Sequence, residues 1–239
     1  MDAPSAASIP ASGGPLLEPR QRWRIAFARA IPASAETIGR AYQSAWEEAL
    51  AATGLPLVET ASGPPRIALA APLPIGVSAR RELLDVWLVA VLEAWRVREA
   101  LEPHLPPGHS IVGLANVWLG APPLPGRVVG ADYLVELEGA VDPAALRAAA
   151  ARIVAAAALP RERAKGGGVK RYDLRPLLGD VVVEDAGPDL AVRFRTLADP
   201  ELGSGRPDEV VAALGDEVGE PLAVRAVVRE RIVLSGDDV

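Results

Sequence analysis

Apolar and polar residues alternate along the first part of the chain in a pattern that predicts strands and helices in a definite order. Trp23, Ile25 and Phe27 alternate with polar or small residues, the period of two that is typical of a strand. From Ser34, a residue type that caps helices, apolar residues recur at helical spacing. We expect two short strands, a second helix and a further strand next, over 66–70, 83–89, 94–101 and 111–119. The predicted order is β-α-β-β-α-β, that of a ferredoxin-like domain.

The second part of the chain repeats this order. Tyr133, Val135 and Leu137 alternate as in a strand, and Asp142 followed by Pro143 is the N-cap and first-turn pair typical of a helix. A basic, glycine-rich segment follows this helix, and further elements are expected near 181–184, 190–197, 207–214 and 222–234. The sequence therefore predicts an α+β protein made of two tandem ferredoxin-like (βαββαβ) halves.

Changes in composition along the chain indicate the domain boundaries. Residues 1–20 are rich in small and polar residues and in proline, which favours a disordered arm. The proline-rich run at 121–126 is typical of a linker. We therefore expect an arm at 1–20, a first half at 21–120, a linker at 121–129 and a second half at 130–236.

Composition narrows the class of protein. Hydrophobic residues make up 50% of the chain, enough for a packed core, although only 4% of the residues are aromatic. The chain has no cysteine, which excludes disulfides, thiolate nucleophiles and cysteine-ligated clusters and fits a reducing compartment. The sequence shows no signal peptide and no apolar run of about 18 residues. We therefore expect a cytoplasmic protein with no membrane partner.

The charge balance limits the nucleic-acid partners. The formal net charge is −6, whereas a general polyanion binder is normally basic. Any RNA site must then be a local patch on an acidic body, and no DNA partner is expected.

The residues that usually carry catalysis form no recognisable set. His104 and His109 lie in one turn without metalloprotease spacing, and we interpret both as ordinary surface histidines. No Ser-His-Asp set, metal-ligand cluster or phosphate-binding glycine motif occurs. The sequence therefore predicts no catalytic residue, no metal ligand and no cofactor.

The segment at 161–175 is the most informative for function. It holds six cationic residues against Glu162 and Asp173, on an otherwise acidic chain. Its three glycines predict a mobile loop, beside which lysine and arginine can hold phosphates, while a tyrosine can stack on an unpaired base. The alternative is a solvated hairpin tip in which Arg175 pairs with Asp173 or with a backbone carbonyl. The candidate substrate- or RNA-binding residues are Arg161, Arg163, Lys165, Lys170, Arg171, Tyr172 and Arg175.

Segments at 65–77 with 82–85, 170–176, 206–210 and 225–234 resemble one known family, with coverage from about 23 to 234. They are similar to the radical SAM-linked proteins, a family of unknown function found beside a radical SAM protein or fused to its C-terminus. The family typically opens its first helix with a Phe-Leu-Ser-His-Leu-Asp run, but residues 31–37 contain neither histidine nor aspartate. Its aromatic, Asn and His loop before the second strand is reduced here to 62–65. If those residues carry a family function, this chain has lost or altered it.

The resemblance implies a division of labour. Radical SAM chemistry needs three cysteines on a [4Fe–4S] cluster, and this chain has none. The favoured hypothesis is a non-catalytic accessory protein that binds an RNA or protein substrate through the basic segment and presents it to a radical SAM partner. A second is a structural protein-interaction module with apolar contacts through Trp87, Trp95 or Trp118. A third is a metal-independent RNA-processing enzyme that uses arginine, lysine and tyrosine.

Overall fold

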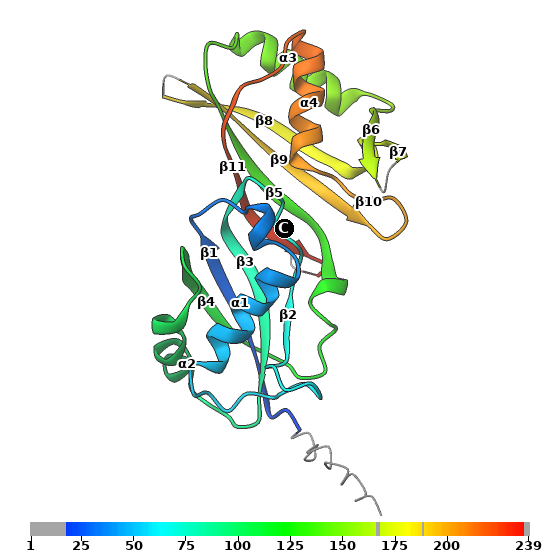
Figure 1. Cartoon of the computed structure of the whole chain (residues 1–239). Coiled ribbons are helices and arrows are strands. Elements are labelled where there is room, and N and C mark those ends of the chain that lie inside the picture. The colour runs from blue at the N-terminus through cyan, green and yellow to red at the C-terminus, as the bar shows by residue number, and fades with distance from the viewer. Residues whose placement is uncertain (1–17, 166–167, 188, 237–239) are drawn as a thin grey trace, which may run out of the picture.

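The computed structural model describes residues 18–165, 168–187 and 189–236. Within them, four α-helices pack on strands that form one large mixed sheet, and a two-stranded hairpin stands apart from that sheet (Figure 1). The structure therefore confirms the predicted α+β class. Residues 1–17 of the predicted arm lie outside the described residues.

The first half is a four-stranded antiparallel sheet with two helices. Its elements are β1 (Gln21–Arg29), α1 (Arg40–Ala51), β2 (Ile67–Leu69), β3 (Val77–Leu88), α2 (Ala94–Leu101) and β4 (His109–Val117). The strand order is β4-β1-β3-β2. Alternation along β1 buries Trp23, Ile25 and Phe27 in one core with Tyr42 and Trp46 of α1. The predicted first strand thus supplies the apolar face on which α1 packs.

The second half has the same succession of strands and helices, with two additions, the β6–β7 hairpin and the two-residue strand β10. Its elements are β5 (Val128–Leu137), α3 (Pro143–Ala155), β6 (Pro160–Lys165), β7 (Gly168–Asp173), β8 (Leu178–Ala186), β9 (Asp189–Asp199), β10 (Gly203–Ser204), α4 (Pro207–Val218) and β11 (Val224–Leu234). The order of the long strands is β8-β9-β5-β11. The predicted cap of α3 is present, because Asp142 Oδ1 accepts a hydrogen bond from Ala144 N at 2.9 Å. The β6–β7 hairpin is inserted between α3 and β8.

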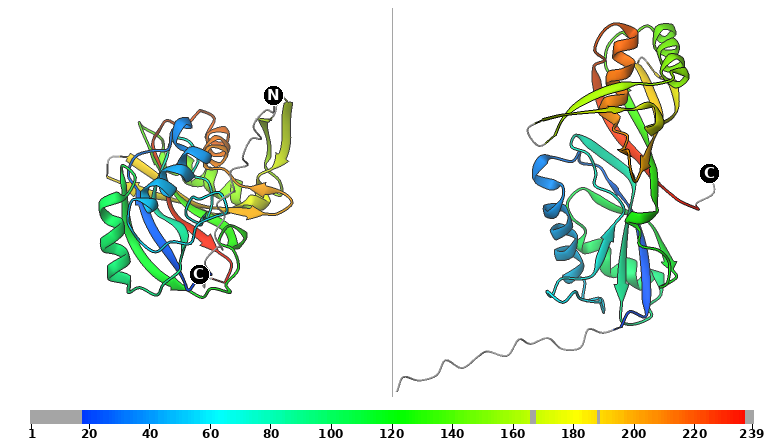
Figure 2. Two further views of the ribbon diagram at one scale, coloured as in Figure 1. Left: turned by 60° about the horizontal axis from the view of Figure 1, so that its bottom comes forward. Right: turned by 90° about the vertical axis from the view of Figure 1, so that its right-hand side faces the viewer.

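Strands β3 and β11 join the two halves. Residues 227–229 of β11 lie parallel to residues 77–79 of β3, while β11 pairs antiparallel with β5 along its whole length. Nine strands of the described part of the chain thereby form one sheet. Figure 2 shows the halves stacked one above the other, with the C-terminal end of β11 at the level of the junction.

The largest errors in the predicted boundaries are the starts of α1 and β3; the first has a local cause and the second a long-range one. Helix α1 begins at Arg40 rather than near Ser34, because Gly39 adopts φ 60° and separates the helix from a short 3-10 turn, Ala35–Thr37. Strand β3 begins at Val77 rather than at 83, because its first residues pair with β11. The paired residues of β3 and β11 lie about 150 residues apart in the sequence, so no local pattern predicts this pairing.

Candidate functional site

The predicted basic segment is a β-hairpin and not a loop. Strands β6 and β7 pair antiparallel over their six residues each, with Arg163 opposite Lys170 and Glu162 opposite Arg171. Six of the seven predicted site residues lie on the hairpin, and Arg175 begins the 3-10 turn that follows it. Gly166 and Gly167, and the side chains of Arg163, Lys165 and Lys170, lie outside the described part of the structure.

The described arginines of the hairpin region have polar partners. Arg171 Nε lies 2.5 Å from Glu162 Oε1, and both side chains are exposed. Arg161 Nη1 lies 2.6 Å from Asp216 Oδ2, which ties β6 to α4. Arg161 therefore attaches the hairpin to α4 in addition to contributing positive charge. Arg171, with 83% of its side chain exposed, remains accessible to a ligand.

Arg175 and Tyr172 hold the base of the hairpin. The guanidinium of Arg175 donates to the Leu178 carbonyl at 2.7 Å, and its backbone N–H donates to Asp173 Oδ1 at 2.9 Å. Asp173 Oδ1 also accepts from Leu159 N at 2.7 Å. Tyr172 packs against the core of the second half. The backbone carbonyl expected as an alternative partner of Arg175 is thus that of Leu178.

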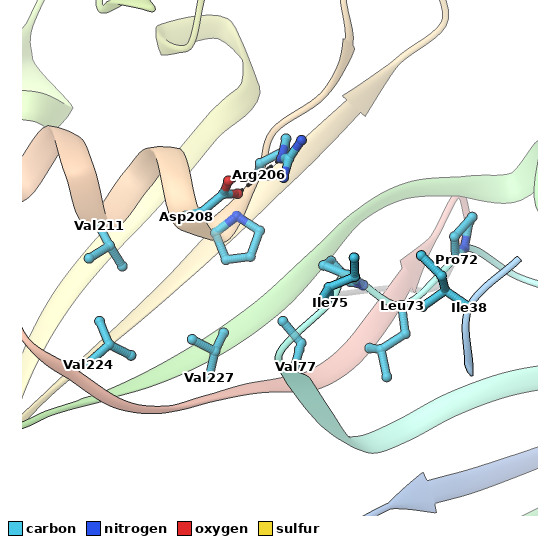
Figure 3. Close-up of a pocket in the computed structure, with 12 residues that line it drawn as sticks. Ile38, Pro72, Leu73, Ile75, Val77, Arg206, Asp208, Val211, Val224 and Val227 are labelled. Carbon is cyan, nitrogen blue, oxygen red and sulfur yellow. Dashed lines mark hydrogen bonds and ion pairs between the residues drawn. The ribbon is translucent and has the colours of Figure 1, made fainter. Parts of the chain in front are cut away.

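A second candidate site lies where the two halves meet, and sequence reasoning missed it. The segment that connects β2 to β3, the first turns of α4 and the start of β11 enclose a cavity of about 640 Å³, which we call the inter-half groove (Figure 3). Most of its lining is apolar, including Ile38, Leu73, Ile75, Val77, Val211 and Val227. Its volume falls in the range of about 300–1,000 Å³ that is usual for ligand sites.

A buried ion pair fixes the connecting segment beside the groove. Arg229 of β11 donates through Nε and Nη2 to the Glu82 carboxylate, and both side chains are almost fully buried. The same guanidinium donates to the carbonyls of Pro72 at 2.9 Å and Ala71 at 3.3 Å. Burial opposes the charge on Arg229, but the Glu82 carboxylate outweighs burial and raises the pKa of Arg229. Removing one partner of such a pair usually costs about 3–5 kcal/mol.

The charged residues along the groove are mostly acidic. Arg206 lies at its mouth and binds Asp208 through two contacts of 3.0 Å, which raises the pKa of Arg206. A second hollow of about 560 Å³ continues along α4 and shares Asp208 with the first. Its other ionisable lining residues are Asp216 and Glu220. One arginine therefore faces three carboxylates along the combined surface.

The sequence carried an indirect signal for this site. Three of the segments that resemble the radical SAM-linked proteins, at 65–77, 206–210 and 225–234, contribute residues to the groove. Taken separately, the three segments predict only a turn, the start of a helix and a strand. Only the parallel pairing of β3 with β11 brings them together.

The histidines are placed differently from one another. His104 is exposed as expected, but His109 is half-buried, so its interpretation as a surface residue was wrong. His109 Nε2 lies 3.1 Å from Tyr42 Oη, and its ring lies within 6 Å of Phe27 and Trp46. Among the residues that the structure describes, no group of three or more His, Asp or Glu side chains is arranged to hold a metal ion. No helix within the described ranges is long and apolar enough to cross a membrane.

The three tryptophans considered for apolar contacts differ in accessibility. Trp87 is buried, with the guanidinium groups of Arg22 and Arg66 over its ring at 4.9 and 4.4 Å. Trp95 and Trp118 are exposed. A contact through Trp87 is therefore excluded by the fold, whereas Trp95 and Trp118 remain accessible.

Comparisons with known proteins identify a family for this chain. No curated protein matches the chain. One similar solved chain comes from the "Crystal Structure of a Cbf5-Nop10-Gar1 Complex", with 11% identity and a TM-score of 0.46, covering 87% of this chain and 48% of that one. This chain thus spans about half the length of that solved chain. The model of a family described as "Uncharacterized protein conserved in bacteria (DUF2344)" matches residues 62–207, which include the hairpin and parts of the inter-half groove. The chain belongs to this family of uncharacterized bacterial proteins.

Proposed function

We propose that the chain is a cytoplasmic, non-catalytic accessory protein that works with a radical SAM enzyme. The similarity of its segments at 65–77 and 170–176 to the radical SAM-linked proteins supports this proposal. A radical SAM enzyme binds its [4Fe–4S] cluster through three cysteines. None of the 239 residues is cysteine, so those ligands have to come from outside this sequence.

Each half is, in this proposal, a ferredoxin-like unit. The strand orders β4-β1-β3-β2 and β11-β5-β9-β8 support the assignment, because both place the first and third strands of the half in the centre. The β6–β7 hairpin is then an addition to the second ferredoxin-like unit. It can therefore have a function of its own, such as substrate binding.

The β6–β7 hairpin is the proposed contact with the substrate, which we take to be RNA. The observation that carries this proposal is that five cationic residues share two short paired strands outside the large sheet, on a chain of net charge −6. The exposed ion pair between Arg171 and Glu162 is no obstacle, since such pairs contribute only about 0–1 kcal/mol. A phosphate can therefore replace Glu162 as the partner of Arg171.

Binding of labelled single-stranded RNA to the full chain tests this function. Lys170→Ala combined with Arg171→Ala should weaken binding several-fold without unfolding the protein, and the affinity should fall steeply with salt. Arg98→Ala combined with Arg147→Ala is the matched control, because both arginines are exposed and ion-paired away from the hairpin. Equal affinity of the hairpin variant and the unmodified protein would exclude the hairpin as the RNA site.

A protein-interaction module is the second candidate function, and the inter-half groove is the observation that favours it. Its lining is largely apolar and comes from both halves. Association of this kind should resist ribonuclease and depend little on hairpin charges. A pull-down from the native host, with and without ribonuclease, distinguishes the two. A radical SAM protein recovered in both conditions, together with co-purifying RNA, supports the accessory function, whereas recovery of a protein partner with no RNA favours the interaction module.

A further inference from the structure

Part of the edge of β11 has no strand partner. On one side β11 pairs with β5 from Val224 to Leu234, with register shifts, one of which leaves Arg225 without a partner residue in β5. On the other side β11 pairs with β3 only over 227–229. Within the described part of the chain, residues 224–226 therefore have a free edge on that second side. Unpaired strand edges readily accept another extended segment.

The turn directly before β3 explains why the edge of β11 at 224–226 has no strand partner. Gly76 adopts φ 78°, a conformation that L side chains rarely take, and the chain turns away from β11 directly before β3 begins. Gly76 N donates to the Ala33 carbonyl at 2.6 Å, and Ala33 N donates to the Val77 carbonyl at 2.9 Å. The segment that would otherwise continue β3 alongside 224–226 is thereby held against the first half.

The free edge borders the inter-half groove. Val224 and Val227 of β11 line the groove, and Val211 of α4 faces them (Figure 3). Val224 is 38% exposed although it belongs to a strand. An extended peptide on this edge could form main-chain hydrogen bonds with β11 and place alternate side chains in the groove, the two components of recognition by strand addition.

The charges beside the groove indicate the chemistry of such a peptide. The charge of Arg206 is balanced by Asp208, and that of Asp216 by Arg161. Glu220 has no ionic partner among the residues that the structure describes. The carboxylate of Glu220, which lies just before β11, is therefore the negative charge that a lysine or arginine of the ligand can complement.

We propose that the inter-half groove binds an extended segment of a protein partner, which adds as a strand to β11 at 224–226. Its apolar side chains at alternate positions enter the groove, and a basic residue on the same face, two positions beyond them, lies toward Glu220. This inference rests on the second proposed function, protein binding, and is independent of RNA binding by the hairpin. It names the binding mode and the chemistry of the ligand.

A defined peptide tests the binding mode. The probe is a fluorescein-labelled Lys-Ser-Val-Ser-Val-Ser-Val peptide, whose lysine and valines share one face of a strand. It is titrated with the full chain and followed by fluorescence anisotropy. A second version carries N-methyl groups on alternate backbone amides, which removes main-chain donors but keeps every side chain. Strand addition predicts saturable binding of the first peptide and a loss of about tenfold or more in affinity for the second. Equal binding of both peptides would leave protein binding in place but overturn strand addition.

Matched variants test the location. Val224→Asp should weaken binding of the unmodified peptide by about tenfold, because a carboxylate would have to be desolvated at the edge. Val182→Asp on β8 is the control, since Val182 is a strand valine that is 51% exposed and lies outside the groove. Glu220→Lys should weaken binding most at low salt. The hairpin variant Lys170→Ala with Arg171→Ala should bind the peptide normally.

Three further results would overturn the proposal. One is an unchanged affinity in Val224→Asp, and another is the absence of any binding to the unmodified peptide. The third is a concentration-dependent dimer, seen by sedimentation and abolished by Val224→Asp but not by Val182→Asp, which would assign the edge to a second copy of this chain.

Discussion

His109 is held in a neutral form by its neighbours. Its Nδ1 lies 3.1 Å from the Pro106 carbonyl and 3.0 Å from the Pro107 carbonyl, so Nδ1 carries the proton. Nε2 then accepts from the hydroxyl of Tyr42, whose pKa is raised to about 12, mainly by burial. Burial also lowers the pKa of His109, and the nearby charge of Arg29 acts in the same direction. Protonation of His109 is therefore unfavourable in the folded protein.

This arrangement predicts a pH dependence of stability. The pKa of His109 is lower in the folded than in the unfolded protein, so the unfolded state binds the proton first as the pH falls below about 6.5. The free energy of unfolding should decrease in this range, by up to about 1.4 kcal/mol per pH unit for this one group. In urea unfolding at several pH values, His109→Gln should remove this contribution to the pH dependence of the free energy of unfolding. His104→Gln, at an exposed histidine, should leave that pH dependence unchanged. An identical slope in His109→Gln would contradict the assignment.

Residue types alone could not distinguish the two histidines. Both lie in one proline-rich turn, and nothing local reports that His109 begins β4 and packs on Phe27 of a strand more than 80 residues earlier. The sequence gives the chemistry of each histidine side chain. Its exposure to solvent, however, depends on contacts with residues far away in the sequence.

At the scale of elements, the turn at Gly76 decides where β3 starts and leaves part of β11 unpaired. An L-residue in this left-handed conformation costs roughly 1–2 kcal/mol. Gly76→Ala should therefore lower the free energy of unfolding by about that amount, although no atom lies within 4 Å of the added methyl group.

Gly126→Ala is the control for this prediction, because Gly126 has equally open surroundings without a positive φ. Thermal or urea unfolding of both variants checks the difference. Equal destabilisation would show that backbone conformation at residue 76 is not the cause.

Most elements could be predicted from their own residues, and the exceptions are instructive. Alternation identified β1, β5 and β11, and Asp142 with Pro143 identified the start of α3. The basic segment was located correctly but was expected to be a loop. Glycine and charged residues do not produce the alternation of apolar and polar positions by which a strand is recognised. Asp173 closes the base of the hairpin through Leu159 N, and Arg161 attaches β6 to α4 through Asp216.

At the scale of the whole molecule, the two halves share one sheet and a buried ion pair between Glu82 and Arg229. A charge pair of this kind is stable only while both partners stay in place. We therefore expect the halves to unfold together, as a single cooperative unit.

The distribution of tryptophan makes this expectation measurable. All five tryptophans lie in the first half, so their fluorescence reports that half alone, whereas far-UV circular dichroism also reports α3 and α4. The two signals should give the same urea midpoint in the wild-type protein. Two separate midpoints would show that the junction through β3 and β11 does not couple the halves.

The sequence by itself determined the α+β class, the order of the strands and helices apart from β6, β7 and β10, and the place of the basic segment, because these follow from periodicity, capping residues and local charge. It also excluded cysteine chemistry on this chain. The tertiary structure alone decided which charges are buried, that Trp87 lies covered between two arginines, and that 72–77, α4 and β11 enclose a groove. These features depend on pairing between segments far apart in the chain, and local patterns carry no information on that pairing.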